Sequence, residues 1–203
     1  MSNEPIKSRI RTIPDHPKPG IQFRDITTLL QDPVGLHLAV QQLANAFKGV
    51  GVSKVAGIEA RGFILGGAVA VVLEAGFVAV RKAGKLPHTT IGVDYDLEYG
   101  TDRVEIHTDA VHRGERVLVV DDIMTTGGSL QETIDAVRAA GGTVAGAAVL
   151  VDRSGGAARL DVPVKALWRL DIPSYSATEC PLCAKGVPAV HPGTTPAPAV
   201  VSR

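Results

Sequence analysis

Residues 117–130 decide the fold, and they read Val-Leu-Val-Val-Asp-Asp-Ile-Met-Thr-Thr-Gly-Gly-Ser-Leu. The first four are apolar and three of them are β-branched, which is typical of a strand buried on both faces of a parallel sheet. We expect this strand to stop at Asp121 and Asp122. A turn of small residues follows, and helical spacing predicts a helix over residues 130–140 that ends at two glycines.

The turn between this strand and helix has the composition of a phosphate-binding loop. A glycine turn that leads into a helix directs unpaired backbone N–H groups toward one point, where the helix dipole is positive. Nearby carboxylates can accept hydrogen bonds from ribose hydroxyls or face a bound metal ion. The pattern predicts a ribose 5-phosphate site, with the phosphate on Thr125, Thr126, Gly127, Gly128 and Ser129 and the ribose on Asp121 and Asp122.

The same loop also has a purely structural interpretation, because Ser129 and Glu132 have the spacing of a helix capping box. Neither G-x-x-x-x-G-K-[ST] nor a G-x-G-x-x-G after a strand is present, which excludes two other phosphate loops. Two adjacent acids before Thr-Thr-Gly-Gly favour the ligand. The motif resembles the signature of the phosphoribosyltransferases that use 5-phosphoribosyl 1-pyrophosphate.

This resemblance covers roughly residues 10–152 and implies an α/β protein of the type I phosphoribosyltransferase fold. In that fold a parallel sheet of about five strands carries helices on both faces, and ligands bind at the carboxyl edge. The resemblance further implies a flexible hood hairpin, Mg²⁺ that binds with phosphoribosyl pyrophosphate without direct protein ligands, and a homodimer.

The composition sets limits on partners and location. The chain has 203 residues, 45% of them hydrophobic, which suits one domain at residues 1–172. Basic and acidic residues both number 21, so no excess charge indicates nucleic acid or a membrane, and we expect small-molecule partners. Two cysteines and an N-terminus without a signal-peptide core indicate the cytoplasm. Residues 62–80 are nearly long enough for a membrane span, but glycines divide them into a helix ending near Ala75 and a strand.

Residues 14–26 are expected to form an extended surface loop, because three prolines and a glycine break regular structure. A linker is the default interpretation, although an aromatic residue beside charge is typical of a binding loop. The segment resembles the base-pocket loop of adenine phosphoribosyltransferases. The resemblance implies that Phe23 stacks on adenine, while backbone groups near Gln22 and Arg24 bond the edge of the base.

Cationic residues follow two further expected strands. Arg61 lies in a Glu-Ala-Arg-Gly-Phe element that resembles one of the family and implies a pyrophosphate contact, with a surface ion pair to Glu59 as the alternative. Such cations are usually solvated, but beside a leaving anion they gain strength as its charge builds up. We assign Lys82 and Lys85 to pyrophosphate, with Arg81 as a further candidate.

Residues 89–107 mix β-prone residues with acids and predict a mobile hairpin whose returning strand starts near Arg103. Together with the preceding turn it forms a hood loop at residues 84–107. Its tip resembles the hood of adenine phosphoribosyltransferases, which closes over the substrate and excludes water. The resemblance carries over Glu98 and Tyr99 as catalytic residues. Glu98 is the candidate for moving the purine proton, and a role in orienting the base stays open.

The other segments predict the remaining core and a tail. Asp32-Pro33 begins a helix with an apolar face, strands follow at residues 54–58, 77–80 and 143–151, and an edge strand at residues 165–172 carries Trp168 as a packing residue. Residues 173–203 form a Pro/Gly-rich, partly disordered tail. Its Cys180 and Cys183 resemble an element of some orotate phosphoribosyltransferases, and a zinc site with His191 lacks a fourth ligand.

Three alternatives to transfer onto adenine stay open. Orotate or another nucleobase could be the acceptor, because the central motif is shared. A non-catalytic regulator that senses phosphoribosyl pyrophosphate would need a basic face or a DNA-binding domain, and the sequence indicates neither. A scaffold without activity would leave the hood and the cations unexplained.

Overall fold

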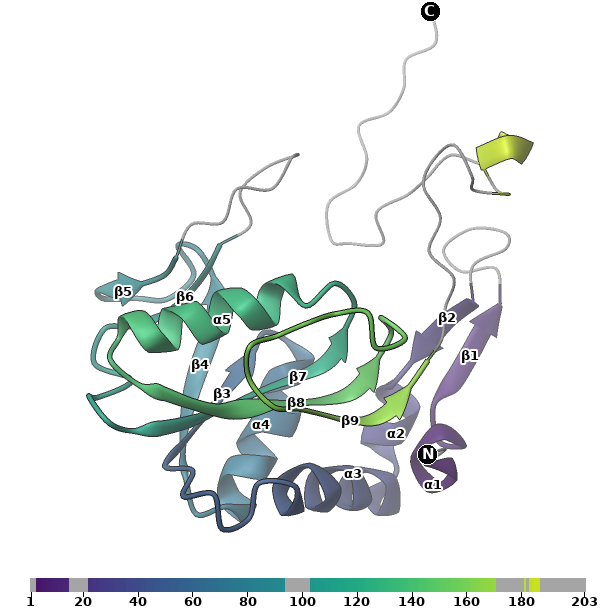
Figure 1. Ribbon diagram of the computed structural model, residues 1–203. Coiled ribbons are helices and arrows are strands. Elements are labelled where there is room, and N and C mark those ends of the chain that lie inside the picture. Colours follow the sequence, from purple (N-terminus) through teal and green to yellow (C-terminus); the bar gives the residue numbers. More distant parts are fainter. Residues whose placement is uncertain (1–2, 15–21, 94–102, 171–180, 182, 187–203) are drawn as a thin grey trace, which may run out of the picture.

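A seven-stranded sheet forms the centre of the structure, a computed structural model that describes residues 3–14, 22–93, 103–170, 181 and 183–186 (Figure 1). The strand order is β5-β6-β4-β3-β7-β8-β9. Neighbours from β4 to β9 are parallel, while β6 pairs antiparallel with β4 and β5. The predicted parallel sheet is therefore confirmed, with two hood strands added at one edge. The strands are β3 (Lys54–Ile58), β4 (Gly76–Lys82), β5 (Thr90–Ile91), β6 (Val104–His107), β7 (Arg116–Met124), β8 (Thr143–Asp152) and β9 (Val164–Arg169).

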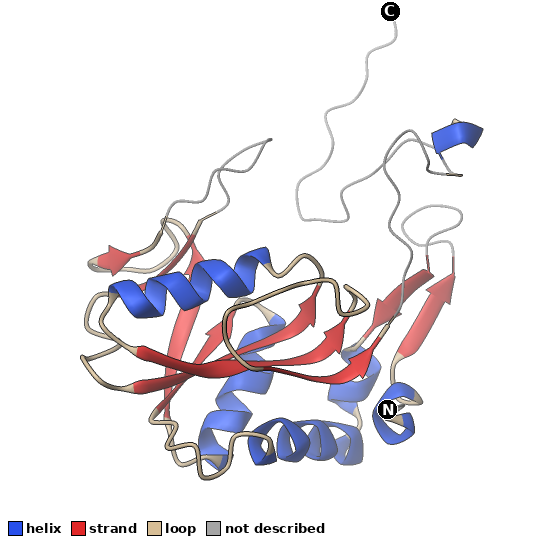
Figure 2. Cartoon of the chain, in the orientation of Figure 1, coloured by secondary structure: helices blue, strands red, loops and turns tan. Residues whose placement is uncertain are grey.

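Helices cover both faces of this sheet (Figure 2). On one face α5 (Gly128–Ala139) buries Leu130 and Ile134 in a core shared with β7 and β8. On the other face α3 (Pro33–Asn45) and α4 (Arg61–Val72) form a second core, to which the short helices α1 (Glu4–Lys7) and α2 (Thr27–Gln31) contribute. The start of α3 matches its prediction, since the Asp32 carboxylate accepts a hydrogen bond from Val34 N at 3.2 Å.

Three predicted boundaries are wrong. Strand β7 does not stop at Asp121 and Asp122, because pairing with β8 continues through Met124 ↔ Asp152 and keeps the backbone extended. Helix α5 begins at Gly128 instead of residue 130, since its N-cap is a left-handed glycine. Helix α4 ends at Val72 instead of near residue 75.

The expected loop at residues 14–26 is part of a two-stranded hairpin. β1 (Arg11–Pro14) pairs antiparallel with β2 (Gln22–Asp25), so both ends of the segment are strands; residues 15–21 lie outside the described part. The wholly extended-loop prediction is wrong here, because backbone pairing satisfies polar groups that a loop would leave to water.

Two predictions about apolar segments are confirmed. Trp168 on the edge strand β9 is a core residue, with 6% of its surface exposed. Residues 62–80 divide into a helix and a strand, and in the described part of the chain we find no helix with the length and apolar character that a bilayer span requires.

Asp25 is expected to make stability depend on pH at the end of the hairpin. Hydrogen bonds from the Thr27 hydroxyl and from Arg11 outweigh burial and lower the pKa of Asp25 to about 2 from 3.8. A lowered pKa stabilises the fold above pH 4, and this contribution declines as the pH falls toward 2. Asp25→Asn should therefore cost roughly 2 kcal/mol at pH 7 and roughly half of that at pH 3, measured by urea unfolding.

The matched control is Asp161→Asn. Its carboxylate is paired with Arg138 but 59% of the side chain is exposed, so water screens the pair. We expect little change in stability at either pH. Equal effects of Asp25→Asn at pH 7 and pH 3 would contradict the prediction.

Candidate functional site

The candidate site lies where the direction of strand progression reverses. From β3 the chain moves through α4 to β4 on one side, whereas β7 moves through α5 to β8 on the other. In open α/β sheets a crevice forms at the carboxyl ends of the two strands that flank such a switch point. The ends of β3 and β7 carry Glu59, Arg61, Asp121 and Asp122, so the sheet itself brings two of the predicted groups together.

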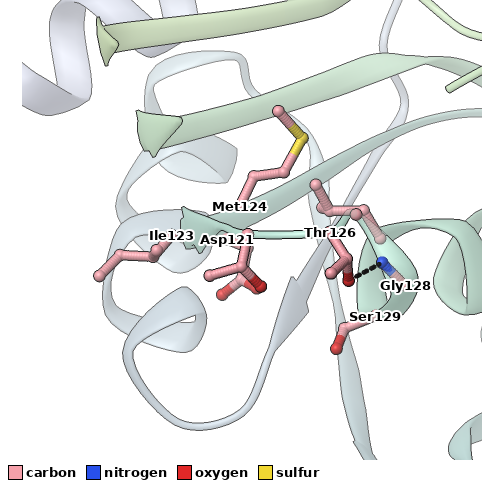
Figure 3. Close-up of a pocket in the computed structure, with 9 residues that line it drawn as sticks. Asp121, Ile123, Met124, Thr126, Gly128 and Ser129 are labelled. Atoms are coloured by element: carbon pink, nitrogen blue, oxygen red, sulfur yellow. Dashed lines mark hydrogen bonds between the residues drawn. The ribbon is translucent and has the colours of Figure 1, made fainter. Parts of the chain in front are cut away.

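The loop after β7 forms a small hollow of about 40 Å³ at the start of α5. Figure 3 shows the Asp121 carboxylate and the Ser129 hydroxyl on the same side of this loop, while Met124 projects to the other. The Thr126 hydroxyl accepts a hydrogen bond from Gly128 N at 3.4 Å. The first helical turn carries N–H groups that the helix cannot pair, so the hollow suits an anion. Its lining includes all five predicted phosphate residues, Thr125, Thr126, Gly127, Gly128 and Ser129.

Gly127 is required at the start of α5 by its backbone conformation. Its φ is 92°, in the left-handed region, and an added Cβ would lie 3.4 Å from a Leu160 methyl carbon. The N-cap of α5 is Gly127, which has no side chain to accept a hydrogen bond, and Ser129 lies inside the helix. The capping-box alternative predicted from Ser129 and Glu132 is thus wrong.

The two acids are buried at the end of β7, and their environments differ. The Asp121 carboxylate accepts a hydrogen bond from Asp122 N at 2.8 Å. Burial, followed by the Asp122 charge, raises the pKa of Asp121 well above its usual value. The close approach of α4 contributes to this burial, since a Cβ at Gly62 would lie only 3.0 Å from Asp121 Oδ1.

Arg61 pairs with an acid of the neighbouring strand. Its Nε lies 2.5 Å from Asp122 Oδ2, and half of its side chain remains exposed. The alternative ion pair with Glu59 is not the one that forms. Arg61 thus bridges the switch point and keeps exposed surface from which it can reach an anion.

Glu59 organises the remaining cations, a role that the sequence analysis missed. Its carboxylate accepts a hydrogen bond from Arg81 Nε at 2.9 Å and from Lys82 N at 3.0 Å, and it lies 3.7 Å from Lys85 Nζ. Burial raises the pKa of Glu59, but these partners outweigh it and the net shift is downward. The peptide bond from Glu59 to Ala60 is cis. The Glu59 carboxylate therefore holds the charged groups of Arg81 and Lys85, and the backbone of Lys82, close to Arg61.

The predicted base residues lie on the separate hairpin. Gln22 is exposed, while Phe23 and Arg24 are half-buried on β2. The Arg24 guanidinium donates to the Thr12 hydroxyl and lies over the ring of Trp168. Glu98 and Tyr99 lie outside the described residues, as do Cys180 and His191, so their predicted roles stay predictions.

The arrangement of loop, acids and cations can be compared with known proteins. Residues 37–175 match the family model described as "Phosphoribosyl transferase domain". An adenine phosphoribosyltransferase of Bradyrhizobium sp. (strain ORS 278) is 55% identical over 82% of this chain and 96% of its own length. The chain belongs to the phosphoribosyltransferase family.

Solved structures place it in the same family. The adenine phosphoribosyltransferase of Rhodothermus marinus superposes with a TM-score of 0.75 at 48% identity, covering 83% of this chain and 98% of that one. The enzyme from Saccharomyces cerevisiae, solved with adenine and an imino-altritol bisphosphate, gives 0.74 at 32% identity, covering 81% and 97%. The type I phosphoribosyltransferase fold is therefore confirmed.

Gly127→Ala should weaken the binding of phosphoribosyl pyrophosphate roughly tenfold, because a left-handed alanine costs about 1–2 kcal/mol and displaces the loop. Gly128→Ala is the matched control, since its Cβ would meet only the Thr126 hydroxyl, at 3.6 Å. Titration calorimetry with Mg²⁺ present measures both. If both variants bound phosphoribosyl pyrophosphate with equal affinity, a role of the loop at residues 125–129 in binding it would be contradicted.

Proposed function

We propose that the chain transfers the 5-phosphoribosyl group of 5-phosphoribosyl 1-pyrophosphate to adenine and releases AMP and pyrophosphate, as a step of purine salvage. One observation carries the proposal: an anion cradle at the start of α5 lies on the same sheet edge as paired acids and a cation cluster. Family membership and curated relatives that are named for this reaction support it.

Each part of the site has one task in this proposal. The loop at residues 125–129 binds the 5-phosphate, and Asp121 and Asp122 hold the ribose hydroxyls. Arg61, Lys82 and Lys85, with Arg81 held by Glu59, stabilise the departing pyrophosphate as its negative charge develops. A ribosyl cation-like transition state needs this stabilisation more than it needs a strong nucleophile.

The acceptor base approaches from the hairpin side. Phe23 stacks on adenine and the backbone near Gln22 and Arg24 bonds its edge, as the family resemblance implies. N9 of adenine then bonds to C1 of the ribose as pyrophosphate leaves. Glu98 takes the purine proton, and the hood with Tyr99 keeps water from the reaction.

Magnesium is proposed to enter with the substrate. The family resemblance implies that substrate oxygens and water surround the ion, without direct protein ligands. The ion would neutralise part of the pyrophosphate charge. We further propose one domain at residues 1–172, a tail at residues 173–203, a cytoplasmic location and small-molecule partners.

A homodimer is proposed through the outer face of α4. Ile64 and Val71 lie two turns apart on this helix, with 50% and 78% of their surfaces exposed, and Phe77 at the start of β4 is 41% exposed. Ile64 and Val71 share one face of the helix by their spacing, and exposed apolar residues on one face mark interaction sites. A second copy of the chain is the partner that the family resemblance implies.

The base specificity is tested by incubating the purified chain with phosphoribosyl pyrophosphate, Mg²⁺ and one base at a time. With adenine, the chain should release pyrophosphate and form AMP. Hypoxanthine, guanine and orotate should react at least about a hundredfold more slowly. A site whose polar groups bond the edge of adenine leaves some of those groups unpaired when a different base binds. Faster turnover of orotate would assign the alternative activity. Release with no base would contradict the proposal altogether.

Sedimentation velocity tests the dimer. Val71→Asp should convert the dimer to a monomer, because a charge at the centre of an apolar contact is costly to desolvate. Val34→Asp is the control, since Val34 is 52% exposed on a different helix, and it should sediment as the wild type. A monomeric wild type would overturn the proposed assembly.

A further inference from the structure

Trp168 connects the main sheet with the hairpin that carries the base residues. It lies on the edge strand β9 and is 6% exposed, in the same core cluster as Ile26 and Leu167. The Arg24 guanidinium carbon lies 5.7 Å from the centroid of the Trp168 ring. This distance is that of a cation–π contact, so a residue of β9 holds a residue of β2.

Other contacts attach the hairpin near its base. Among the described residues, β1 and β2 form a sheet of their own that is separate from the seven-stranded one. Arg11 N bonds to the Thr28 hydroxyl at 3.1 Å, and Ile26 enters the core. These contacts hold the base of the hairpin, whereas the Arg24–Trp168 contact lies farther along β2.

Arg24 and Phe23 are neighbours on one strand, so their side chains leave β2 on opposite faces. A hold on Arg24 therefore fixes the rotation of the strand and with it the direction of Phe23. Among the described residues the buried Arg24 Nε has no hydrogen-bond partner, which leaves the Trp168 ring as the partner of that part of the guanidinium.

We propose that Trp168 is a positioning residue for base recognition: by holding Arg24 it sets the orientation in which the hairpin presents Phe23 to the base. The inference rests on the proposed function, in which Phe23 stacks on adenine. It assigns a specificity role to a core residue of the edge strand, far along the chain from the base-pocket segment.

Steady-state kinetics test the role. Trp168→Leu should raise KM for adenine about threefold to tenfold, as expected for the loss of a desolvated cation–π contact, with KM for phosphoribosyl pyrophosphate and kcat unchanged within about twofold. Trp168→Phe keeps an aromatic face and should give a smaller rise. Leu167→Ala is the control, because it removes a similarly buried side chain of the same strand. It should lower thermal stability without changing the ratio of the two KM values.

A double-mutant cycle tests whether Trp168 acts through Arg24. In an Arg24→Gln background, Trp168→Leu should add no further increase in KM for adenine, because the contact is already lost. An equal rise in both KM values, or an increment that persists without Arg24, would overturn the positioning role. If Trp168→Leu does not fold, the same cycle is measured with Trp168→Phe, whose smaller rise in KM for adenine should likewise disappear in the Arg24→Gln background.

Hydrogen exchange separates this inference from the proposed function. Backbone amides of residues 11–14 and 22–25 should exchange faster in Trp168→Leu than in Leu167→Ala, whatever base the enzyme uses. Equal exchange in the two variants would overturn the positioning of the hairpin. A wild-type chain that makes no AMP but shows the faster exchange in Trp168→Leu would overturn only the assignment of adenine.

Discussion

The close approach of α4 to the end of β7 is the constraint on which the site depends. Gly62 makes it possible, because a Cβ there would lie 3.0 Å from both Asp121 Oδ1 and Val120 O. The residue before it, Arg61, is thereby placed within 2.5 Å of Asp122. A parallel sheet brings strand ends together only approximately, and this contact fixes the ends of β3 and β7 relative to each other. The acids and the first cation therefore form one unit.

A second balance of charge lies beside this unit. The positive charges of three neighbouring residues, Arg81, Lys82 and Lys85, repel one another. The negative charge of a substrate can order them only once the substrate has bound. Glu59 supplies a resident negative charge, since Arg81 Nε donates to it and Lys85 Nζ lies 3.7 Å from it. Cations that are oriented before a ligand binds need not be ordered during the reaction, which is how fixed charges stabilise a transition state efficiently.

The order of strands and helices, and the glycine turn between β7 and α5, could be predicted from the sequence, because hydrophobic periodicity and glycine turns act locally. Helix boundaries were missed by a few residues, and the larger failures depend on contacts distant in the chain. β7 continues past its two acids because β8 pairs with them, and residues 14–26 begin and end as strands because β1 and β2 pair. Arg61 is two residues from Glu59 in sequence, yet its partner Asp122 is 61 residues away. No spacing rule indicates such a pair.

The two neighbouring aspartates of the motif have different surroundings and can therefore have different roles. Asp121 is enclosed by α4 and the backbone, and burial together with the neighbouring Asp122 charge raises its pKa. Asp122 has a guanidinium beside it that supplies the opposite charge. Two ribose hydroxyls can each both donate and accept. An asymmetric pair of acids can satisfy both of them without placing two unpaired negative charges side by side near a substrate that is itself an anion.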